Sequence, residues 1–528
     1  MLKLDFLKKR GARLALLAVS AVLTGLTVCY PVLGILEWMT LIPAFAVFYD
    51  IAKDRELRLR RVYLYGFFFS MCYFVAVWHW FFAMYPMEYT GMNAPTALFV
   101  VILAVLGIPI VQSSTFAFVF VLFAKLARGR VLGKLSALSP LALAALWCIF
   151  EWTQTLFWFG VPWGRLALGQ TELLVTLQSA SLLGPYFVSF LIAAVNGMIA
   201  YAICNVEGRK LLAVSSAAVF AANLAFGAFA VISRGEPQNT VKVAVIQGNI
   251  SSTEKWGLGW RKATFDSYSA LTEQAAADGA KIVIWPESVV LLYDYQSRED
   301  VKKIAAENNV TLLFGALPHM GDEQYNSIIT VLPDGTLSEE IYSKRRLVPF
   351  GEYVPMKDSL GKLIPVLQDI AMLGNDLTPG EDSNILHTEY GNIGSLICFD
   401  SIYEELALDS ARDGAGIIAI ETNDSWFYDS AAVWMHEGQA RMRAIETGKY
   451  VVRAANTGVS AIIDPAGEIV EEIPPLVAGY AVGDVEFRDS RTLYTYLGNL
   501  WVWISIGAIA GLIVTDTAIL ISEKKKQL

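Results

Sequence analysis

Long apolar stretches separated by short polar loops fill the first 235 residues and return near the C-terminus. A helix of about 20 apolar residues is long enough to span a bilayer. Eight stretches have about this length, at residues 12–29, 32–51, 62–83, 94–124, 136–157, 176–204, 210–232 and 497–521. The pattern predicts an integral membrane protein with about eight transmembrane helices.

The segment 236–490 has a different pattern. Short runs rich in Val and Ile, such as "TVKVAVIQ", "KIVIW" and "GIIAIET", alternate with amphipathic stretches such as "REDVKKIAAEN". Such continuous runs indicate strands buried on both faces, and their alternation with helical patterns indicates an α/β domain. We therefore expect a helical membrane bundle over 1–235, an α/β domain over 236–490, and a last transmembrane helix with a basic tail over 491–528.

One part of this segment predicts a hairpin. "YNSIITVLPDGTLSEEIYSK" holds two strand-like runs on either side of Pro333-Asp334-Gly335, a typical turn sequence.

Lys and Arg residues gather in every second connection. They precede the first span, follow the last, and occupy the loops between spans two and three, four and five, and six and seven. Cytoplasmic loops of membrane proteins carry this excess. Both termini are therefore expected in the cytoplasm and the α/β domain on the far side, which in a bacterium is the periplasmic side of the inner membrane. No basic soluble face with interleaved aromatics is present, so a nucleic-acid partner is not expected.

Cys398, in "GSLICFDSIYEE", is the residue that first indicates chemistry. The other four cysteines lie in predicted spans, so Cys398 has no disulfide partner in the exported domain. It ends a strand-like run and precedes a helix. A lone thiol in an oxidising compartment is either a buried inert residue or a nucleophile, and this residue alone leaves both open.

Three further side chains follow strand-like runs in the same domain. Glu287 follows "KIVIW", and Lys344 follows the second strand of the hairpin, with Glu352 in the loop after it. Taken singly, each residue has a purely structural interpretation. Glu287 could be a helix cap, and Lys344 could be a solvated cation beside Arg345 and Arg346. Glu352 could simply hold its loop together. The ends of strands in α/β sheets gather active-site residues. A carboxylate, an ammonium and a thiol together suit acyl transfer through a thioester.

His436 is a possible alternative partner of the thiol, which spacing alone does not exclude. We find no metal-ligand spacing and no phosphate-binding loop in the sequence, so neither a metal nor a cofactor is expected.

Several motifs resemble the nitrilase, or carbon-nitrogen hydrolase, superfamily: "WPES", "SKRRLVPFGEYVP", "LICFD" and "RMRAIETGKYVVRAANTGVSAIIDPAGE". Eight spans with the α/β domain before the last are similar to its membrane branch, the apolipoprotein N-acyltransferases. The resemblance implies an αββα sandwich with a Glu-Lys-Cys triad. The residues that it implies are Glu287 as general base, Lys344 as oxyanion stabiliser, Cys398 as nucleophile, Glu352 as supporting acid and Trp256 as lid residue. Phe399 and Asp400 stand where this branch more usually has Tyr and Glu, and their roles stay open.

The resemblance also implies substrates. A membrane phospholipid would give its acyl chain to Cys398, and the acceptor would be the N-terminal diacylglyceryl-cysteine of a bacterial lipoprotein. The residues alone indicate only thiol acyl transfer at a membrane surface. Two alternatives remain: a membrane-anchored amidase or nitrilase-type hydrolase with water as acceptor, and a catalytically silent homologue that binds lipid or lipoprotein.

Overall fold

The computed structural model describes residues 9–527 except 88–89, 135, 158–159, 206–207, 251–259, 292, 358–375 and 382–383. The chain forms two units. The helical unit comprises Met1–Phe82, Val100–Ser233 and Leu497–Leu528, and the sandwich unit comprises Ala83–Phe99 and Arg234–Tyr496.

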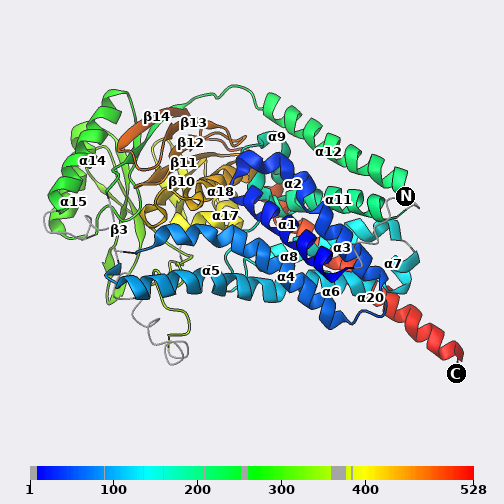
Figure 1. Ribbon diagram of the computed structural model, residues 1–528. Coiled ribbons are helices and arrows are strands. Elements are labelled where there is room, and N and C mark those ends of the chain that lie inside the picture. The colour runs from blue at the N-terminus through cyan, green and yellow to red at the C-terminus, as the bar shows by residue number, and fades with distance from the viewer. Residues whose placement is uncertain are drawn as a thin grey trace. The chain divides into compact units, whose positions relative to one another are not determined.

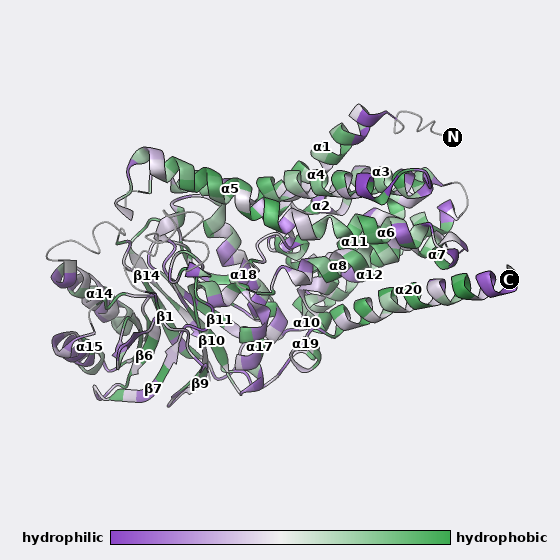
Figure 2. Ribbon diagram, turned by 90° about the horizontal axis from the view of Figure 1, so that it is seen from below, coloured by the Kyte–Doolittle hydropathy of each residue, from purple (hydrophilic) through white to green (hydrophobic). Residues whose placement is uncertain are grey.

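Within the described residues, eight helical segments are long and apolar enough to cross a membrane. This agrees with the expected number, and Figure 2 shows their predominantly hydrophobic colouring. The segments are Arg10–Cys29, Pro31–Lys53, Leu59–Met84, Ala94–Ala127, Ser136–Thr153, Pro185–Cys204, Arg209–Ile232 and Leu500–Lys526. Their helices are α1 (Arg10–Cys29), α2 (Gly34–Thr40), α3 (Ile42–Lys53), α4 (Leu59–Trp78), α5 (Ala94–Phe116), α6 (Phe118–Ala127), α8 (Ser139–Thr153), α11 (Pro185–Cys204), α12 (Arg209–Ile232) and α20 (Leu500–Gln527), with short α7 (Arg130–Lys134) after α6.

The sixth segment is shorter than the expected 176–204. Its helix α11 begins at Pro185, and two short helices, α9 (Leu174–Leu177) and α10 (Ala180–Leu183), precede it. Gly184 separates them with φ of 84°, a conformation that glycine adopts readily, and proline suits the first turn of a helix. The hydrophobic pattern alone does not reveal this break.

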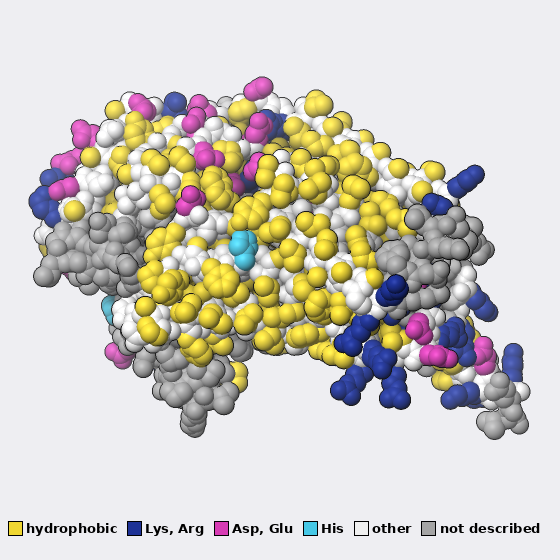
Figure 3. Space-filling model, viewed as in Figure 1, with side chains coloured by type: hydrophobic (Ala, Val, Ile, Leu, Met, Phe, Trp, Pro, Cys, Tyr) yellow, Lys and Arg dark blue, Asp and Glu magenta, His cyan; other side chains and the backbone are white. Residues whose placement is uncertain are grey.

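Exposed cations gather at one end of the helical unit. Five of them lie from the end of α3 to the start of α4: Lys53, Arg55, Arg58, Arg60 and Arg61. Figure 3 shows Lys and Arg grouped at this end, and in Figure 1 the start of α1 and the end of α20 lie there as well.

The sandwich unit contains two six-stranded sheets. The first has the order β14-β1-β2-β3-β6-β7 and the second β13-β12-β11-β10-β9-β8. The first sheet comprises β1 (Val241–Gln247), β2 (Ile282–Ile284), β3 (Thr311–Ala316), β6 (Ser327–Val331), β7 (Leu337–Ser343) and β14 (Gly479–Val485). The second comprises β8 (Ile385–Thr388), β9 (Gly391–Ile397), β10 (Ile417–Thr422), β11 (Tyr450–Ala455), β12 (Ser460–Ile463) and β13 (Ile469–Ile473). A small ribbon pairs β4 (His319–Met320) with β5 (Glu323–Gln324).

Helices cover the outer faces of the two sheets. Helices α14 (Trp260–Ala277) and α15 (Tyr295–Asn308) lie on the first sheet, and α17 (Glu404–Arg412) and α18 (Ala431–Thr447) on the second (Figure 1). Apolar side chains of both sheets fill the space between them, among them Val245, Ile284, Ile397, Ala419 and Val452. The expected αββα sandwich is thus confirmed. Helix α19 (Leu493–Leu497) follows it.

Parallel pairing brings the ends of the central strands together. Strand β2 is parallel to β1 and β3, and β10 is parallel to β9 and β11. The expected hairpin joins β6 and β7, with Ile328 opposite Tyr342 and Ser327 opposite Ser343. Glu287 therefore follows the end of β2, Lys344 the end of β7, and Cys398 the end of β9.

Candidate active site

Glu287 lies in a tight turn that folds over strand β3. The turn is held by hydrogen bonds from Trp285 N to Leu313 O, 2.9 Å, and from Val290 N to Gly315 O, 3.0 Å. The backbones are so close that a Cβ atom on Gly315 would lie 2.7 Å from the Cα of Glu287. Only glycine allows this approach, so Gly315 helps to fix the position of the Glu287 carboxylate.

Lys344 lies between two carboxylates and is buried. Its Nζ is 2.9 Å from Glu287 Oε1 and 2.8 Å from Glu352 Oε1, and its side chain is 1% exposed. Burial lowers the pKa of Lys344, but the two carboxylates raise it by more. The pKa of Lys344 therefore lies well above its ordinary value. Lys344 is therefore an ammonium ion, a fixed positive charge in a dry site.

Asn326 and the Glu352 loop support this ion cluster. Asn326 Nδ2 donates to Glu287 Oε1 at 2.7 Å and to Glu352 Oε1 at 3.0 Å. The second oxygen of Glu352 accepts from Val348 N at 2.8 Å, which ties the loop to the cluster. The sequence around Asn326 does not by itself indicate a role in the site. The available signal was the hairpin, because pairing of β6 with β7 puts Asn326 beside Lys344, whose N donates to Asn326 O at 2.8 Å.

Cys398 begins a 3-10 turn, Cys398–Ile402, directly after β9. Its φ is 48°, in the left-handed region that few residues other than glycine adopt. Its carbonyl oxygen accepts from Ser401 Oγ at 2.7 Å, which helps to hold the strained turn. Strain of this kind is typical of functional positions.

The thiol of Cys398 is neutral at rest. Burial raises its pKa, the Glu287 carboxylate raises it further, and Lys344 lowers it by less than these two together, so the pKa lies above its ordinary value. Glu287, Lys344 and Cys398, which are far apart in the sequence, therefore lie close enough in the fold for their charges to affect one another. A neutral thiol needs a base when it reacts, and Glu287 is the carboxylate with the largest effect on it.

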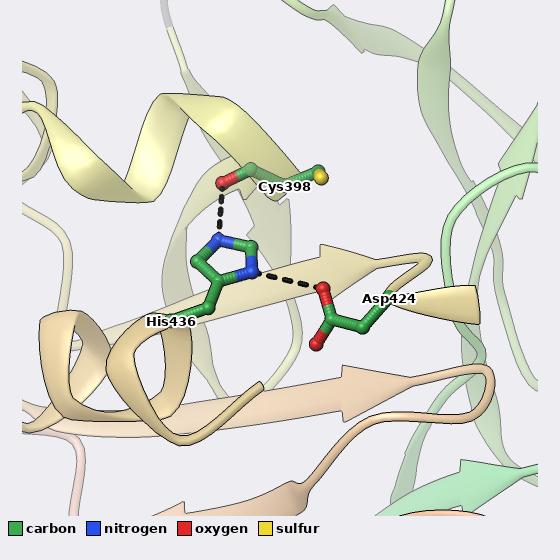
Figure 4. A group of neighbouring side chains, drawn as sticks. All are labelled: Cys398, Asp424 and His436. Carbon is green, nitrogen blue, oxygen red and sulfur yellow. Dashed lines mark hydrogen bonds and ion pairs between the residues drawn. The ribbon is translucent and has the colours of Figure 1, made fainter. Parts of the chain in front are cut away.

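His436 contacts the backbone of Cys398 (Figure 4). Its Nε2 is 3.2 Å from Cys398 O, while its Nδ1 is 2.8 Å from Asp424 Oδ1. Arg453 donates to the other Asp424 oxygen at 2.6 Å. Figure 4 shows the sulfur on the side of the residue away from the imidazole ring. The geometry makes His436 a support of the turn that carries Cys398.

These residues also form the one group in the described ranges whose spacing could hold a metal ion. Ligand atoms of Cys398, Asp424 and His436 lie within 4.8 Å of one another. Both nitrogens of His436 and both oxygens of Asp424 are engaged in the contacts just given, and the Arg453 guanidinium disfavours a second cation at Asp424. The donor set fits a hydrogen-bond network better than a metal centre.

Asp400 joins the turn of Cys398 to the Lys344 loop. Its buried carboxylate accepts from Tyr342 OH at 2.7 Å, Arg346 N at 2.8 Å and Ile397 N at 3.1 Å. Burial raises the pKa of Asp400 to about 6, against the lowering effect of Lys344 and of these hydrogen bonds. The half-buried Phe399 packs edge-on against Tyr403, with ring centroids 5.5 Å apart.

Arg345 and Arg346 form surface ion pairs and do not join the buried cluster. Arg345 lies 3.8 Å from Asp409, and Arg346 pairs with Glu405; the two arginine side chains are 32% and 45% exposed. Trp256, expected as a lid residue, lies outside the described residues.

Comparisons with known proteins follow the same division of the chain. The family model "Carbon-nitrogen hydrolase" matches residues 242–494, and "Apolipoprotein N-acyltransferase N-terminal domain" matches residues 20–198. Among solved structures, the chain is similar to Nit3 of Saccharomyces cerevisiae, a member of branch 10 of the nitrilase superfamily. The TM-score is 0.37 and the sequence identity 22%, over 47% of this chain and 91% of that one.

Curated relatives match over most of their length. The apolipoprotein N-acyltransferase of Geobacter metallireducens is 31% identical over 69% of this chain and 72% of the relative. That of Gloeobacter violaceus is 28% identical over 90% of each. On both family models and these relatives, the chain belongs to the apolipoprotein N-acyltransferase family.

Proposed function

We propose that this protein transfers an acyl chain from a membrane phospholipid to the α-amino group of an S-diacylglyceryl-cysteine at the N-terminus of a lipoprotein. Membership of the family supports the reaction. The observation that carries the mechanism is the buried ammonium of Lys344, held between Glu287 and Glu352 and coupled electrostatically to the thiol of Cys398. We place the sandwich unit on the periplasmic side of a bacterial inner membrane, with both termini in the cytoplasm, because of the alternating basic loops.

The first half-reaction forms a thioester. Glu287 takes the proton of the Cys398 thiol, and the sulfur attacks the ester carbonyl carbon of the phospholipid. Lys344 stabilises the oxyanion of the tetrahedral intermediate. The carbon–oxygen bond then breaks, Glu287 returns the proton to the leaving oxygen, and lysophospholipid departs.

The second half-reaction forms the amide. The neutral amine of the acceptor attacks the thioester carbon, and Glu287 accepts one of its protons. The carbon–sulfur bond breaks, and Glu287 gives this proton to the Cys398 sulfur. The products are an N-acylated lipoprotein and the free thiol, so the enzyme returns to its starting state.

The remaining site residues hold this machinery in position. Asn326 and Glu352 keep the carboxylate of Glu287 and the ammonium of Lys344 in contact. Asp400 fixes the turn of Cys398 relative to the Lys344 loop. Phe399 and Trp256 are apolar residues suited to exclude water from the thioester, which must survive until the amine arrives.

A single experiment tests the proposal. The purified protein is incubated with phospholipid labelled in its acyl chain and without lipoprotein. We expect one stoichiometric burst of lysophospholipid and a hydroxylamine-labile acyl group on the protein. A diacylglyceryl lipopeptide with a free α-amine should then remove the label, whereas the N-acetylated peptide should not.

Variants and alternative outcomes complete this test. Cys398→Ala should give no burst, and Cys398→Ser little, because a carboxylate ionises a hydroxyl far less readily than a thiol. Continuous release of labelled fatty acid without an acceptor would identify water as the second substrate, as in a hydrolase. Lipid binding without any acyl-enzyme would indicate a silent homologue.

A further inference from the structure

Glu421 is a carboxyl group at the active site that the mechanism above does not use. It is the fifth residue of strand β10, where it pairs with Ile397 of β9 and Ala454 of β11. Ala419 and Ile417, two and four positions earlier, belong to the core between the sheets. Since side chains alternate along a strand, Glu421 points to this same face, at the strand end beside the turn of Cys398.

Glu421 has no hydrogen-bond partner among the described residues. Its side chain is 0% exposed, and neither carboxyl oxygen is bonded. In the part of the chain that the structure describes, the charges that act on it are those of Glu287 and the phenol of Tyr268, and neither is a cation. Burial, and after it the Glu287 carboxylate, raise the pKa of Glu421 well above its ordinary value. At rest Glu421 is therefore a neutral carboxylic acid beside the general base.

A buried polar group without a partner is costly, and a substrate group can supply the missing hydrogen bond. The two substrates differ in what they offer. The alcohol oxygen of lysophospholipid carries one hydrogen, and Glu287 donates or accepts it as a proton. A primary amine carries two, of which Glu287 takes one. The other stays on the nitrogen through the reaction and becomes the N–H of the amide, so in a dry site it needs an acceptor of its own.

We propose that Glu421 is a specificity-determining residue for the acceptor. The carbonyl oxygen of Glu421 accepts a hydrogen bond from the N–H group that the amine keeps as it becomes an amide. This inference rests on the proposed function and names the residue that recognises its second substrate. Glu421 and Glu287 then hold the two hydrogens of one nitrogen, which directs the lone pair of the amine toward the thioester carbon. Alcohols gain nothing from Glu421.

The test compares two acceptors on the same acyl-enzyme. The acyl-enzyme of each variant is formed from labelled phospholipid and isolated. It is then mixed either with a diacylglyceryl lipopeptide that has a free amine, or with lysophospholipid, which reverses the first half-reaction. The measured quantity is the ratio of the two discharge rates. In Glu421→Leu this ratio should fall about tenfold to a hundredfold, the effect of leaving one buried donor without an acceptor.

Two further substitutions of Glu421 and one control variant sharpen the comparison. Glu421→Gln keeps a carbonyl oxygen and should have a ratio close to that of the unchanged protein. Glu339→Leu removes an exposed glutamate of strand β7 and serves as the matched control. Glu421→Met repeats the apolar substitution with a flexible side chain, in case leucine does not fit.

Each outcome decides the inference. A lower ratio in the leucine and methionine variants, with a normal ratio in the glutamine variant, supports it. An unchanged ratio overturns it, and so does loss of acyl-enzyme in both apolar variants, since a residue that serves only the acceptor is not needed for the first half-reaction. A glutamine variant as defective as leucine would overturn it too, because the acidic proton would then be essential. Failure of the proposed function itself would appear separately, as an unchanged protein without a burst.

Discussion

Replacement of Lys344 by methionine should damage both folding and catalysis, for reasons that can be separated. Methionine keeps the length of the side chain and removes the charge. The cluster of Glu287, Glu352 and Lys344 has a net charge of −1, and Lys344→Met changes it to −2 at a site where the lysine side chain is 1% exposed. Removing one partner of a buried ion pair typically costs about 3–5 kcal/mol of unfolding free energy.

The loss of catalytic rate has a different origin and should occur alongside the loss of unfolding free energy. Loss of one oxyanion donor typically slows the chemical step by about a hundredfold to a thousandfold, or about 3–4 kcal/mol. The double variant Lys344→Met/Glu352→Gln returns the cluster to −1. It should recover the part of the unfolding free energy that comes from repulsion between the two carboxylates, but none of the burst rate, because Glu287 still lacks a cation.

Two measurements check this pair of variants. Denaturant unfolding in detergent gives the free energy, and a single-turnover experiment gives the rate of the lysophospholipid burst. Arg345→Ala is the matched control, since Arg345 is 32% exposed and lies 3.8 Å from Asp409. Surface pairs of this kind contribute about 0–1 kcal/mol. Recovery of the burst in the double variant would show that Lys344 is only structural, and an equal loss in Arg345→Ala would assign the whole loop to lipid binding.

Three other predictions concern separate parts of the molecule. The burst should slow as the pH falls through about 6, because protonation of Asp400 removes an acceptor from its three donors, while Asp400→Asn should be slow at every pH. Since the pKa of Asp400 is raised from 3.8, its ionisation opposes folding, so this acid loss should appear in the rate and not in the unfolding free energy. Gly315→Ala should slow the burst at least about tenfold and cost about 1–3 kcal/mol of stability, because the new methyl group lies 2.7 Å from the Cα of Glu287; an unchanged burst would contradict the proposed positioning. A reporter fused after Asp464 should be active only outside the cytoplasm and one fused after Lys526 only inside, and the reverse result would overturn the orientation.

Most of the site residues that the sequence predicts are found from their positions at the ends of strands. Glu287, Lys344 and Cys398 each follow a short apolar run, and such runs pair in parallel or as hairpins, so their ends converge. The eight apolar helices are equally visible, since hydrophobic length alone defines them. Local patterns of this kind depend on neighbours in the sequence, which is why they can be read without a structure.

The sequence does not predict which side chains on different strands contact each other. Asn326 binds two carboxylates because a hairpin register brings it to Lys344, and nothing in its own surroundings indicates this. Glu421 looks like an ordinary strand glutamate until its burial between two sheets is known. The hydrophobic pattern does not show the break before Pro185, because short apolar helices and a transmembrane helix have the same pattern.

The pairing of β1 with β14 has a consequence for the order of synthesis and folding. Val241 and Val485 are neighbours across the first sheet, although they begin and end the strands of this unit. Until β14 emerges from the ribosome, β1 is an edge strand with unpaired backbone groups on one side, a surface that invites aggregation. Contacts between such distant residues form slowly. The nascent chain should therefore stay unfolded, and able to pass through a narrow translocation channel, until almost the entire domain has been made. The last apolar helix follows shortly after β14, the strand that completes the sheet.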